Sequence, residues 1–143
     1  MKVIALLLSL AAVASAGGVV RDMLGGNTGS NCDQSLQTYN VNKFVVTPWP
    51  PSKNEWLNLS MNGTMTAPVT LKGMGIFVTF NGLNFYQETI PEDGSYNAGQ
   101  YYALAFKAYL PSIAPNGKYG VDVKMVSTTG AFLNCWGVTF TLS

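Results

Sequence analysis

The segment 133–142 constrains the fold most strongly, because apolar and polar side chains alternate along it. Large apolar side chains occupy every second position: Trp136, Val138, Phe140 and Leu142. The positions between them carry Cys135, Gly137, Thr139 and Thr141. A period of two residues is typical of a β-strand with one buried face. We therefore predict a half-buried strand here, with a cysteine at its start.

Further strand-like stretches precede this one, and residues that favour turns separate them. They cover residues 39–47, 55–66, 69–80, 83–86, 100–110 and 119–126. The dipeptide Asn81-Gly82 indicates a hairpin, while Gly73 and Gly75 indicate a bulge or a close backbone approach. Residues 17–143 contain neither a helical apolar stripe nor an internal repeat. About seven short strands predict an all-β sandwich or barrel.

The N-terminal segment has the pattern of a secretory signal peptide. A basic start at Lys2 precedes the apolar run 3–13, and Ala14-Ser15-Ala16 forms a cleavage site. The run is shorter than the roughly 20 residues of a membrane-spanning helix. We predict a signal peptide at 1–16, a flexible leader at 17–31 and a folded domain at 32–143. The signal-peptide pattern predicts that the protein is secreted or lies in the endosomal or lysosomal lumen.

Charge and hydrophobicity restrict the classes of partner. Without Lys2, the eight basic side chains become seven and balance the seven acidic ones. This balance argues against nucleic acid as a partner, and against strong attraction to anionic membranes. The chain is 48% hydrophobic and only 10% charged. Either an ordinary core or a core that also holds a lipid must take up this apolar content.

The chain has two cysteines, Cys32 and Cys135, and no histidine. In an oxidising compartment, two cysteines most simply form one disulfide, while a reactive thiol and a metal site are the alternatives. Two thiols without histidine make a zinc site improbable, so we expect no metal. A disulfide closing so long a loop would stabilise the fold by up to about 4–5 kcal/mol in the chain-entropy model.

Groups for catalysis are scarce. No histidine is available as a general base near neutral pH. Glu92 and Asp93 are adjacent in a turn and do not form the carboxylate pair of a glycosidase. Neither a phosphate-binding loop nor a nucleophile elbow is present. We therefore predict a protein that is not an enzyme and needs no cofactor.

Two glycosylation sequons lie in the stretch 55–66. They begin at Asn58 and Asn62, and both asparagines fall on the polar side of the predicted strand. Glycans on this side would not enter the core. The alternative is a chance occurrence, because Asn and Thr are common in this chain.

Several motifs together resemble the ML (MD-2-related lipid-recognition) domain family. They are Asn31-Cys32-Asp33, Val45-Val46-Thr47-Pro48, the strand with the sequons, Pro91-Glu92-Asp93-Gly94, Tyr101-Tyr102, Gly117-Lys118-Tyr119 and Asn134-Cys135-Trp136-Gly137-Val138. The two cysteine motifs are the most specific, and the likeness covers nearly all of 32–143. The likeness is strongest to the Niemann-Pick type C sterol carrier and the phosphatidylglycerol/phosphatidylinositol transfer proteins. Unlike the sterol carrier, which has three disulfides, this chain retains cysteines for one.

The resemblance implies an immunoglobulin-like β-sandwich of about seven to eight antiparallel strands, with an apolar cavity between the sheets. It implies a Cys32–Cys135 disulfide and a protein that binds and transfers a sterol or a phospholipid. The expected protein is a monomer that makes transient contact with membranes or with a membrane lipid acceptor. The alternative is a recognition protein, either a lipid-sensing co-receptor or a carbohydrate-binding sandwich. A carbohydrate site would expose Trp49 and Trp56 and would lack a cavity.

Strand alternation and the resemblance together select candidate cavity residues. The lining is predicted to include Leu59, Met61, Phe106, Val121, Val123, Met125, Trp136, Val138 and Phe140. The mouth is predicted near the loops 91–99 and 111–117, with Tyr101, Tyr102 and Leu110 beside it. Composition alone does not separate this interpretation from an ordinary packed core.

Overall fold

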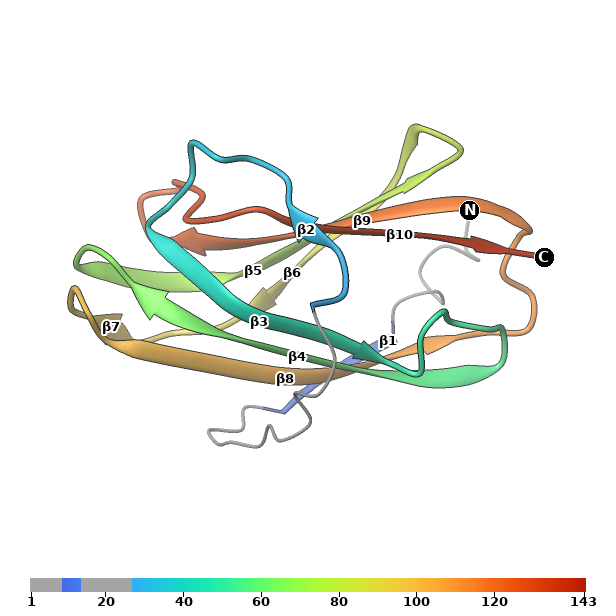
Figure 1. Ribbon diagram of the computed structural model, residues 1–143, viewed down its shortest axis with the longest axis horizontal. Coiled ribbons are helices and arrows are strands. Elements are labelled where there is room, and N and C mark those ends of the chain that lie inside the picture. The colour runs from blue at the N-terminus through green and yellow to red at the C-terminus, as the bar shows by residue number, and fades with distance from the viewer. Residues whose placement is uncertain (1–8, 14–26) are drawn as a thin grey trace.

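The chain folds into two antiparallel β-sheets packed face to face in a computed structural model that describes residues 9–13 and 27–143 (Figure 1). The order in the first sheet is β1 (Ser9–Val13), β8 (Tyr101–Leu110), β4 (Glu55–Met65), β3 (Tyr39–Thr47). The order in the second sheet is β2 (Ser30–Asn31), β10 (Trp136–Leu142), β9 (Gly117–Ser127), β5 (Val69–Phe80), β6 (Leu83–Pro91). The short β7 (Ser95–Tyr96) pairs with β5. No helix occurs among the described residues, so the predicted all-β sandwich is confirmed.

The last strand has the predicted alternation. In β10, Trp136, Val138 and Leu142 are buried, whereas Thr139 and Thr141 are exposed. The strand begins only at Trp136, because Leu133 to Cys135 make individual hydrogen bonds instead of a continuous ladder. The predicted strand 83–86 is longer in the structure and reaches Pro91, since β5 offers partners as far as Gly73.

The predicted backbone irregularities are present in β5 and in the hairpin that follows it. Asn81 and Gly82 have φ angles of 51° and 87°, as expected for a tight two-residue hairpin. The register between β5 and β9 shifts between Leu71 and Gly73, which confirms a bulge. A Cβ added at Gly73 would lie 2.6 Å from the carbonyl oxygen of Ile90, so the close approach of β6 requires glycine there.

The two ends of the sandwich differ in how they pack. We call the end where β3 and β8 begin the closed end, at the left of Figure 1, and the other the open end. At the closed end, Tyr39 donates from its hydroxyl to the carbonyl oxygen of Tyr102 at 2.8 Å. Tyr102 in turn donates to Glu92 Oε1 at 2.7 Å. Together with the fully buried Met65, these residues fill the closed end as ordinary core.

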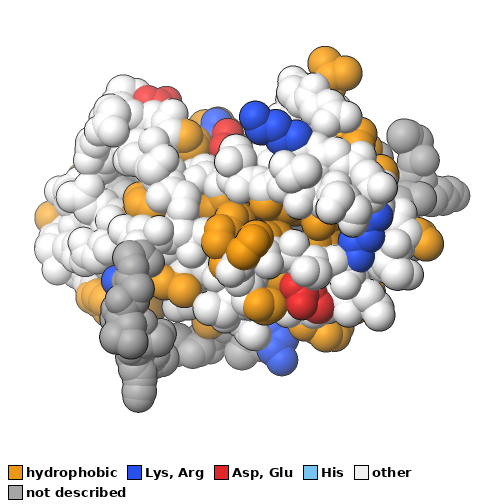
Figure 2. All heavy atoms as spheres, turned by 45° about the vertical axis from the view of Figure 1, so that its right-hand side comes forward, with side chains coloured by type: hydrophobic (Ala, Val, Ile, Leu, Met, Phe, Trp, Pro, Cys, Tyr) orange, Lys and Arg blue, Asp and Glu red, His pale blue; other side chains and the backbone are white. Residues whose placement is uncertain are grey.

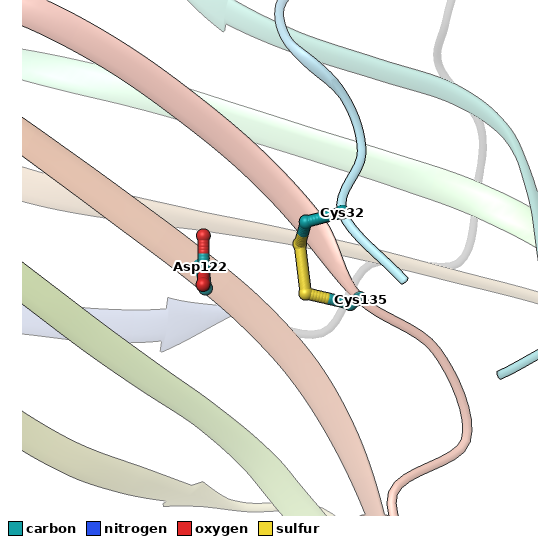
Figure 3. A group of neighbouring side chains, drawn as sticks. All are labelled: Cys32, Asp122 and Cys135. Atoms are coloured by element: carbon teal, nitrogen blue, oxygen red, sulfur yellow. A yellow bond between two sulfur atoms is a disulfide. The ribbon is translucent and has the colours of Figure 1, made fainter. Parts of the chain in front are cut away.

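The disulfide between Cys32 and Cys135 is present, with Cα atoms 5.1 Å apart, and it joins positions 103 residues apart (Figure 3). It ties the segment after β2 to the start of β10, as the resemblance implied. The backbone N–H of Cys32 also donates to the carbonyl oxygen of Cys135 at 3.0 Å. The first and last parts of the domain are therefore joined covalently and by hydrogen bonding.

The predicted signal peptide lies only partly within the described residues. Its segment Ser9–Val13 forms β1, which pairs antiparallel with Tyr109 to Ala105 along the edge of β8. Residues 1–8 and 14–26, which contain the rest of the signal peptide and most of the leader, lie outside the described residues. Among the described residues, no helix is long and apolar enough to cross a membrane.

Candidate functional site

An apolar pocket lies between the two sheets in the half of the sandwich toward the open end. The first sheet and its connections contribute Val46, Trp49, Leu57, Leu59, Phe106, Ala108, Tyr109 and Leu110. The second sheet contributes Ile76, Val121, Val123, Val138 and Phe140. The pocket has a cavity volume of about 60 Å³. It has no charged residue in its lining, so it suits a hydrocarbon group.

The inner faces of the sheets remain partly accessible to solvent at this end. Leu59, Val121 and Phe140 are on the inward side of their strands, yet all three are only half-buried. Toward the closed end, the inward-facing Met61 and Met125 are buried to 1% and 0% exposure. Figure 2 turns the open end toward the viewer and shows hydrophobic side chains gathered near the centre of this face. The sandwich is thus closed at one end and accessible at the other.

Trp49 covers part of the pocket mouth. It belongs to the connection between β3 and β4, and its indole lies edge-on to the ring of Phe140 in β10, with centroids 5.9 Å apart and planes at 82°. Trp49 is 39% exposed, so one side of the indole contacts the pocket while another contacts solvent. This contact joins the two sheets at the mouth.

Polar groups stand around the same mouth. Lys53 donates from Nζ to Asn116 Oδ1 and so joins the β3–β4 connection to the β8–β9 connection. The Tyr109 hydroxyl donates to Asn54 Oδ1 at 2.5 Å, and the backbone N–H of Asn54 donates to the carbonyl oxygen of Leu110. An apolar interior with a polar rim that carries an ammonium group is suited to an amphipathic ligand.

The structure places most of the predicted cavity residues at this pocket. Leu59, Phe106, Val121, Val123, Val138 and Phe140 line it. Met61, Met125 and Trp136 lie deeper, in the packed part of the core. Trp136 stacks on Phe44 and donates from Nε1 to the carbonyl oxygen of Thr28 at 2.7 Å. These contacts keep the indole out of the pocket, although its strand alternation matches that of Val138.

The predicted mouth residues lie at opposite ends of the molecule. Leu110 lines the pocket, whereas Tyr101 and Tyr102 lie at the closed end. The reason is geometric: β8 has 10 residues, and at about 3.4 Å per residue its two ends are roughly 30 Å apart. The loops 91–99 and 111–117 therefore do not border one opening, and only the second lies beside the pocket.

The predicted lining and mouth lack several residues that line the pocket: Val46, Trp49, Leu57, Ile76, Ala108 and Tyr109. Ile76 and Ala108 follow the inward alternation of β5 and β8, so a complete application of that pattern would have found them. Trp49 lies in a connection, where strand alternation gives no signal. Of the predicted glycosylation sites, Asn58 is exposed and Asn62 is half-buried, and their occupancy stays a prediction.

One further cluster carries metal-ligating atom types. Among the described residues, Cys32, Asp122 and Cys135 have their sulfur and carboxylate atoms within 4.8 Å of one another (Figure 3). Both sulfur atoms are already bonded in the disulfide, so they are not thiolate ligands. A Cβ at Gly137 would lie 2.9 Å from Asp122 Oδ1, which explains why this crowded position is glycine. The cluster is therefore a structural disulfide with the carboxylate of Asp122 beside it.

The fold and the pocket define a class of protein: a β-sandwich that can admit an apolar ligand between its sheets through one end. A family model described as the ML domain matches residues 26–142, so the chain belongs to the ML domain family. It is accordingly a lipid-binding protein and not an enzyme, as the sequence analysis predicted.

Individual relatives are distant but similar over most of their length. Two proteins from Dictyostelium discoideum are named as candidate phosphatidylglycerol/phosphatidylinositol transfer proteins. One is 24% identical over 123 residues, covering 78% of this chain and 80% of that protein. The other is 25% identical over 130 residues, covering 82% and 87%. The crystal structure of a Niemann-Pick type C2 protein from the Japanese carpenter ant aligns with a TM-score of 0.61 and 9% identity, covering 81% of this chain and 99% of that one. This last likeness concerns the fold alone.

Proposed function

We propose that the protein carries an anionic phospholipid. An acyl chain of the lipid lies in the pocket, and its head group lies at the polar rim around the pocket mouth. The observation that carries the proposal is the accessibility of Leu59, Val121 and Phe140 from the open end. Inward-facing side chains of a filled sandwich are normally covered by the opposite sheet. Here they offer apolar surface to a ligand that enters from the end.

The pocket must widen to hold such a ligand. Its cavity volume of about 60 Å³ is well below the roughly 300–1,000 Å³ of typical ligand sites. Uptake therefore replaces contacts between the sheets with contacts between each sheet and the acyl chain. Each methylene removed from water contributes about 0.8 kcal/mol, which offsets the cost of separating the sheets.

The rim favours a phospholipid over a sterol. Lys53 supplies an ammonium group beside Asn116, and Tyr109 and Asn54 supply further polar groups. An ammonium group attracts a phosphate diester, while the hydroxyl of a sterol has no charge to attract it. The names of the two Dictyostelium relatives support the same class of ligand.

The carbohydrate-binding alternative has less support. Trp49 and Trp56 are 39% and 49% exposed, as that alternative requires. However, Trp49 also lines an apolar pocket, and the carbohydrate interpretation predicted that no cavity would exist.

The proposal includes where the protein acts and its oligomeric state. The signal-peptide pattern at 1–16 and the disulfide support export to the extracellular space or to the endosomal or lysosomal lumen. We propose a monomer there, because one chain contains the whole pocket. The mass of the exported protein tests the signal peptide: cleavage after Ala16 predicts an N-terminus at Gly17, and a retained segment 1–16 would contradict it.

Competition for a fluorescent acyl-labelled phosphatidylglycerol tests the ligand class. Unlabelled phosphatidylglycerol should displace the probe at the lowest concentration, phosphatidylcholine at a higher one and cholesterol at the highest. The variant Lys53→Gln should weaken the binding of phosphatidylglycerol, the labelled probe included, more than that of phosphatidylcholine, because the rim loses its ammonium group. Stronger displacement by cholesterol than by either phospholipid would overturn the phospholipid assignment.

A further inference from the structure

We propose that the open end is a docking surface for an anionic lipid bilayer, and that Trp49 opens the pocket when the protein docks. The docking surface consists of the side chains of Trp49, Trp56 and Ile113, with Lys53, Lys107 and Lys118 around them. This inference rests on the proposed function, because it states where the carried lipid enters and leaves.

Three exposed apolar side chains of the docking surface come from separate segments. Trp49 lies in the β3–β4 connection, Trp56 near the start of β4 and Ile113 in the β8–β9 connection. They are 39%, 49% and 59% exposed. Ile113 precedes the buried Ala114, so the loop is anchored in the core while Ile113 extends outward. Tryptophan prefers the interface between lipid and water, because its ring is apolar and its N–H is polar.

The charge around these side chains is basic. Lys53 and Lys118 lie in the segments at the open end, and Lys107 is exposed on β8 two residues before Tyr109, the ring neighbour of Trp56. Among the described residues, Glu55 is the carboxylate side chain at this end. Figure 2 shows both basic and acidic side chains around the central hydrophobic group. The balanced charge of residues 17–143 thus conceals an uneven distribution that matches an anionic bilayer.

The pocket opens at the same surface. Trp49 both lines the pocket and contacts solvent, and its ring rests on Phe140 of the opposite sheet. An indole that moves into the bilayer interface leaves Phe140 and separates the two sheets at the mouth. The apolar interior then faces the bilayer directly. A lipid can pass between them without exposing its acyl chain to water, which is the costly step of transfer.

Vesicle binding with matched variants tests the docking surface. The double variant Trp56→Ser, Ile113→Ser removes two exposed apolar side chains. The control Tyr101→Ser removes an aromatic side chain that is 55% exposed at the closed end. On phosphatidylcholine vesicles that contain phosphatidylglycerol, the double variant should bind at least about tenfold more weakly than the parent. The control should bind within about twofold, and equal binding by the double variant would overturn the proposal.

Two further experiments test the basic charge of the docking surface and whether a second copy of the chain occupies it instead of a bilayer. Lys118→Gln should weaken binding by roughly fivefold on anionic vesicles and have no effect on pure phosphatidylcholine. Loss of binding to both vesicle types alike would contradict the electrostatic part. Sedimentation velocity tests whether a second copy of the chain occupies this surface. If the parent dimerises and the double variant stays monomeric, the surface is a dimer interface and the bilayer proposal is overturned.

Quenching by brominated lipids tests the role of Trp49. In the variant Trp56→Phe, the remaining tryptophans are the half-exposed Trp49 and the buried Trp136. Vesicles of brominated phosphatidylcholine and phosphatidylglycerol should quench the emission of Trp49 and leave that of the buried Trp136 unchanged. No quenching on vesicles to which the variant binds would refute insertion of Trp49.

These results are separable from the proposed function. Loading with a monomeric fluorescent phospholipid requires no bilayer, so the docking variants should load as the parent does while they transfer lipid between vesicles more slowly. Failure of every protein to load would reject the lipid pocket and leave the vesicle-binding result to stand alone. Normal loading with unchanged transfer in the double variant would reject the docking surface.

Discussion

Phe44 and Trp136 stack across the two sheets, with ring centroids 5.8 Å apart and ring planes inclined by 20°. Phe44 lies one inward position beyond Val46, which lines the pocket. Trp136 is the register partner of Val123, which also lines it. The stack therefore forms the floor of the pocket. Beyond it, toward the closed end, the sandwich packs as an ordinary core.

Removing the floor should deepen the pocket. Phe44→Ala is expected to destabilise the protein by about 3–5 kcal/mol, because the fully buried ring leaves a cavity. The same change should shift the preferred ligand toward longer acyl chains, which native mass spectrometry of loaded protein measures. Met65→Ala is the control: it removes a side chain of 0% exposure at the closed end and should cost about 2–5 kcal/mol. An unchanged chain-length preference in Phe44→Ala would contradict the assignment of the floor.

Filling the pocket should separate lipid uptake from folding. Val121 lines the pocket and is half-buried, so the ring in Val121→Trp has room to occupy the space that a lipid would take. This variant should keep a melting temperature close to that of the parent and lose uptake of the fluorescent phospholipid. Val123 also lines the pocket but is 0% exposed, and Val123→Trp should overpack the core at a cost of about 1–3 kcal/mol or more. Normal uptake by a folded Val121→Trp would mean that the ligand binds elsewhere.

Lipid binding should change little with pH between about 5 and 8. Histidine is the side chain whose ordinary pKa lies in this range, and the chain contains none. We expect phospholipid affinities at the two limits to agree within about twofold. A large difference between neutral and lysosomal pH would show that a carboxylate with a shifted pKa controls the pocket.

Stability should fall at alkaline pH. Burial raises the pKa of Tyr39 above its ordinary value, and burial together with the hydrogen bond to Glu92 raises the pKa of Tyr102. The unfolded chain then loses these protons more readily than the folded chain. Their contribution to stability is complete below about pH 10 and declines as the pH rises above it. Urea unfolding across this range measures the decline, and Tyr39→Phe should reduce its slope. Constant stability up to strongly alkaline pH would contradict this account.

The disulfide should support the fold without taking part in ligand binding. The double variant Cys32→Ser, Cys135→Ser should lose about 2–5 kcal/mol of stability. Phospholipid affinity should be retained at temperatures where the variant is folded, because neither cysteine lines the pocket. Peptide mapping without reductant should recover one linked pair of peptides from the parent. Two free thiols there, or loss of binding by the folded variant, would oppose this assignment.

The sequence predicted the sheets better than it predicted the site. Alternation in β10 identified Trp136 and Val138 as inward-facing, and both are buried. Alternation is a local property, whereas the pocket depends on which inward residues of one sheet meet those of the other. Nothing in the local pattern distinguishes Val138, at the pocket, from Trp136, at its floor. The difference arises from Phe44, which is distant in sequence and supplies the ring that Trp136 stacks on.

The mouth was predicted with less success for a related reason. The sequence placed Tyr102 and Leu110 at one opening, but β8 carries them to opposite ends of the sandwich. Closure at the Tyr102 end depends on its contacts with Tyr39 and Glu92, which come from β3 and from the segment after β6. Such contacts between distant segments leave no periodic signal in the sequence. Trp49 was proposed as a surface aromatic, and its second role at the pocket became visible only with Phe140 in place.

Native mass spectrometry of the exported protein, followed by lipid extraction, shows directly whether the protein carries a phospholipid. We expect one phospholipid bound to each chain, with phosphatidylglycerol or another anionic class enriched over the host membrane. Val121→Trp, purified in the same way, should carry no lipid. A parent protein that is free of lipid after purification, and that takes up no phospholipid from vesicles, would contradict the account.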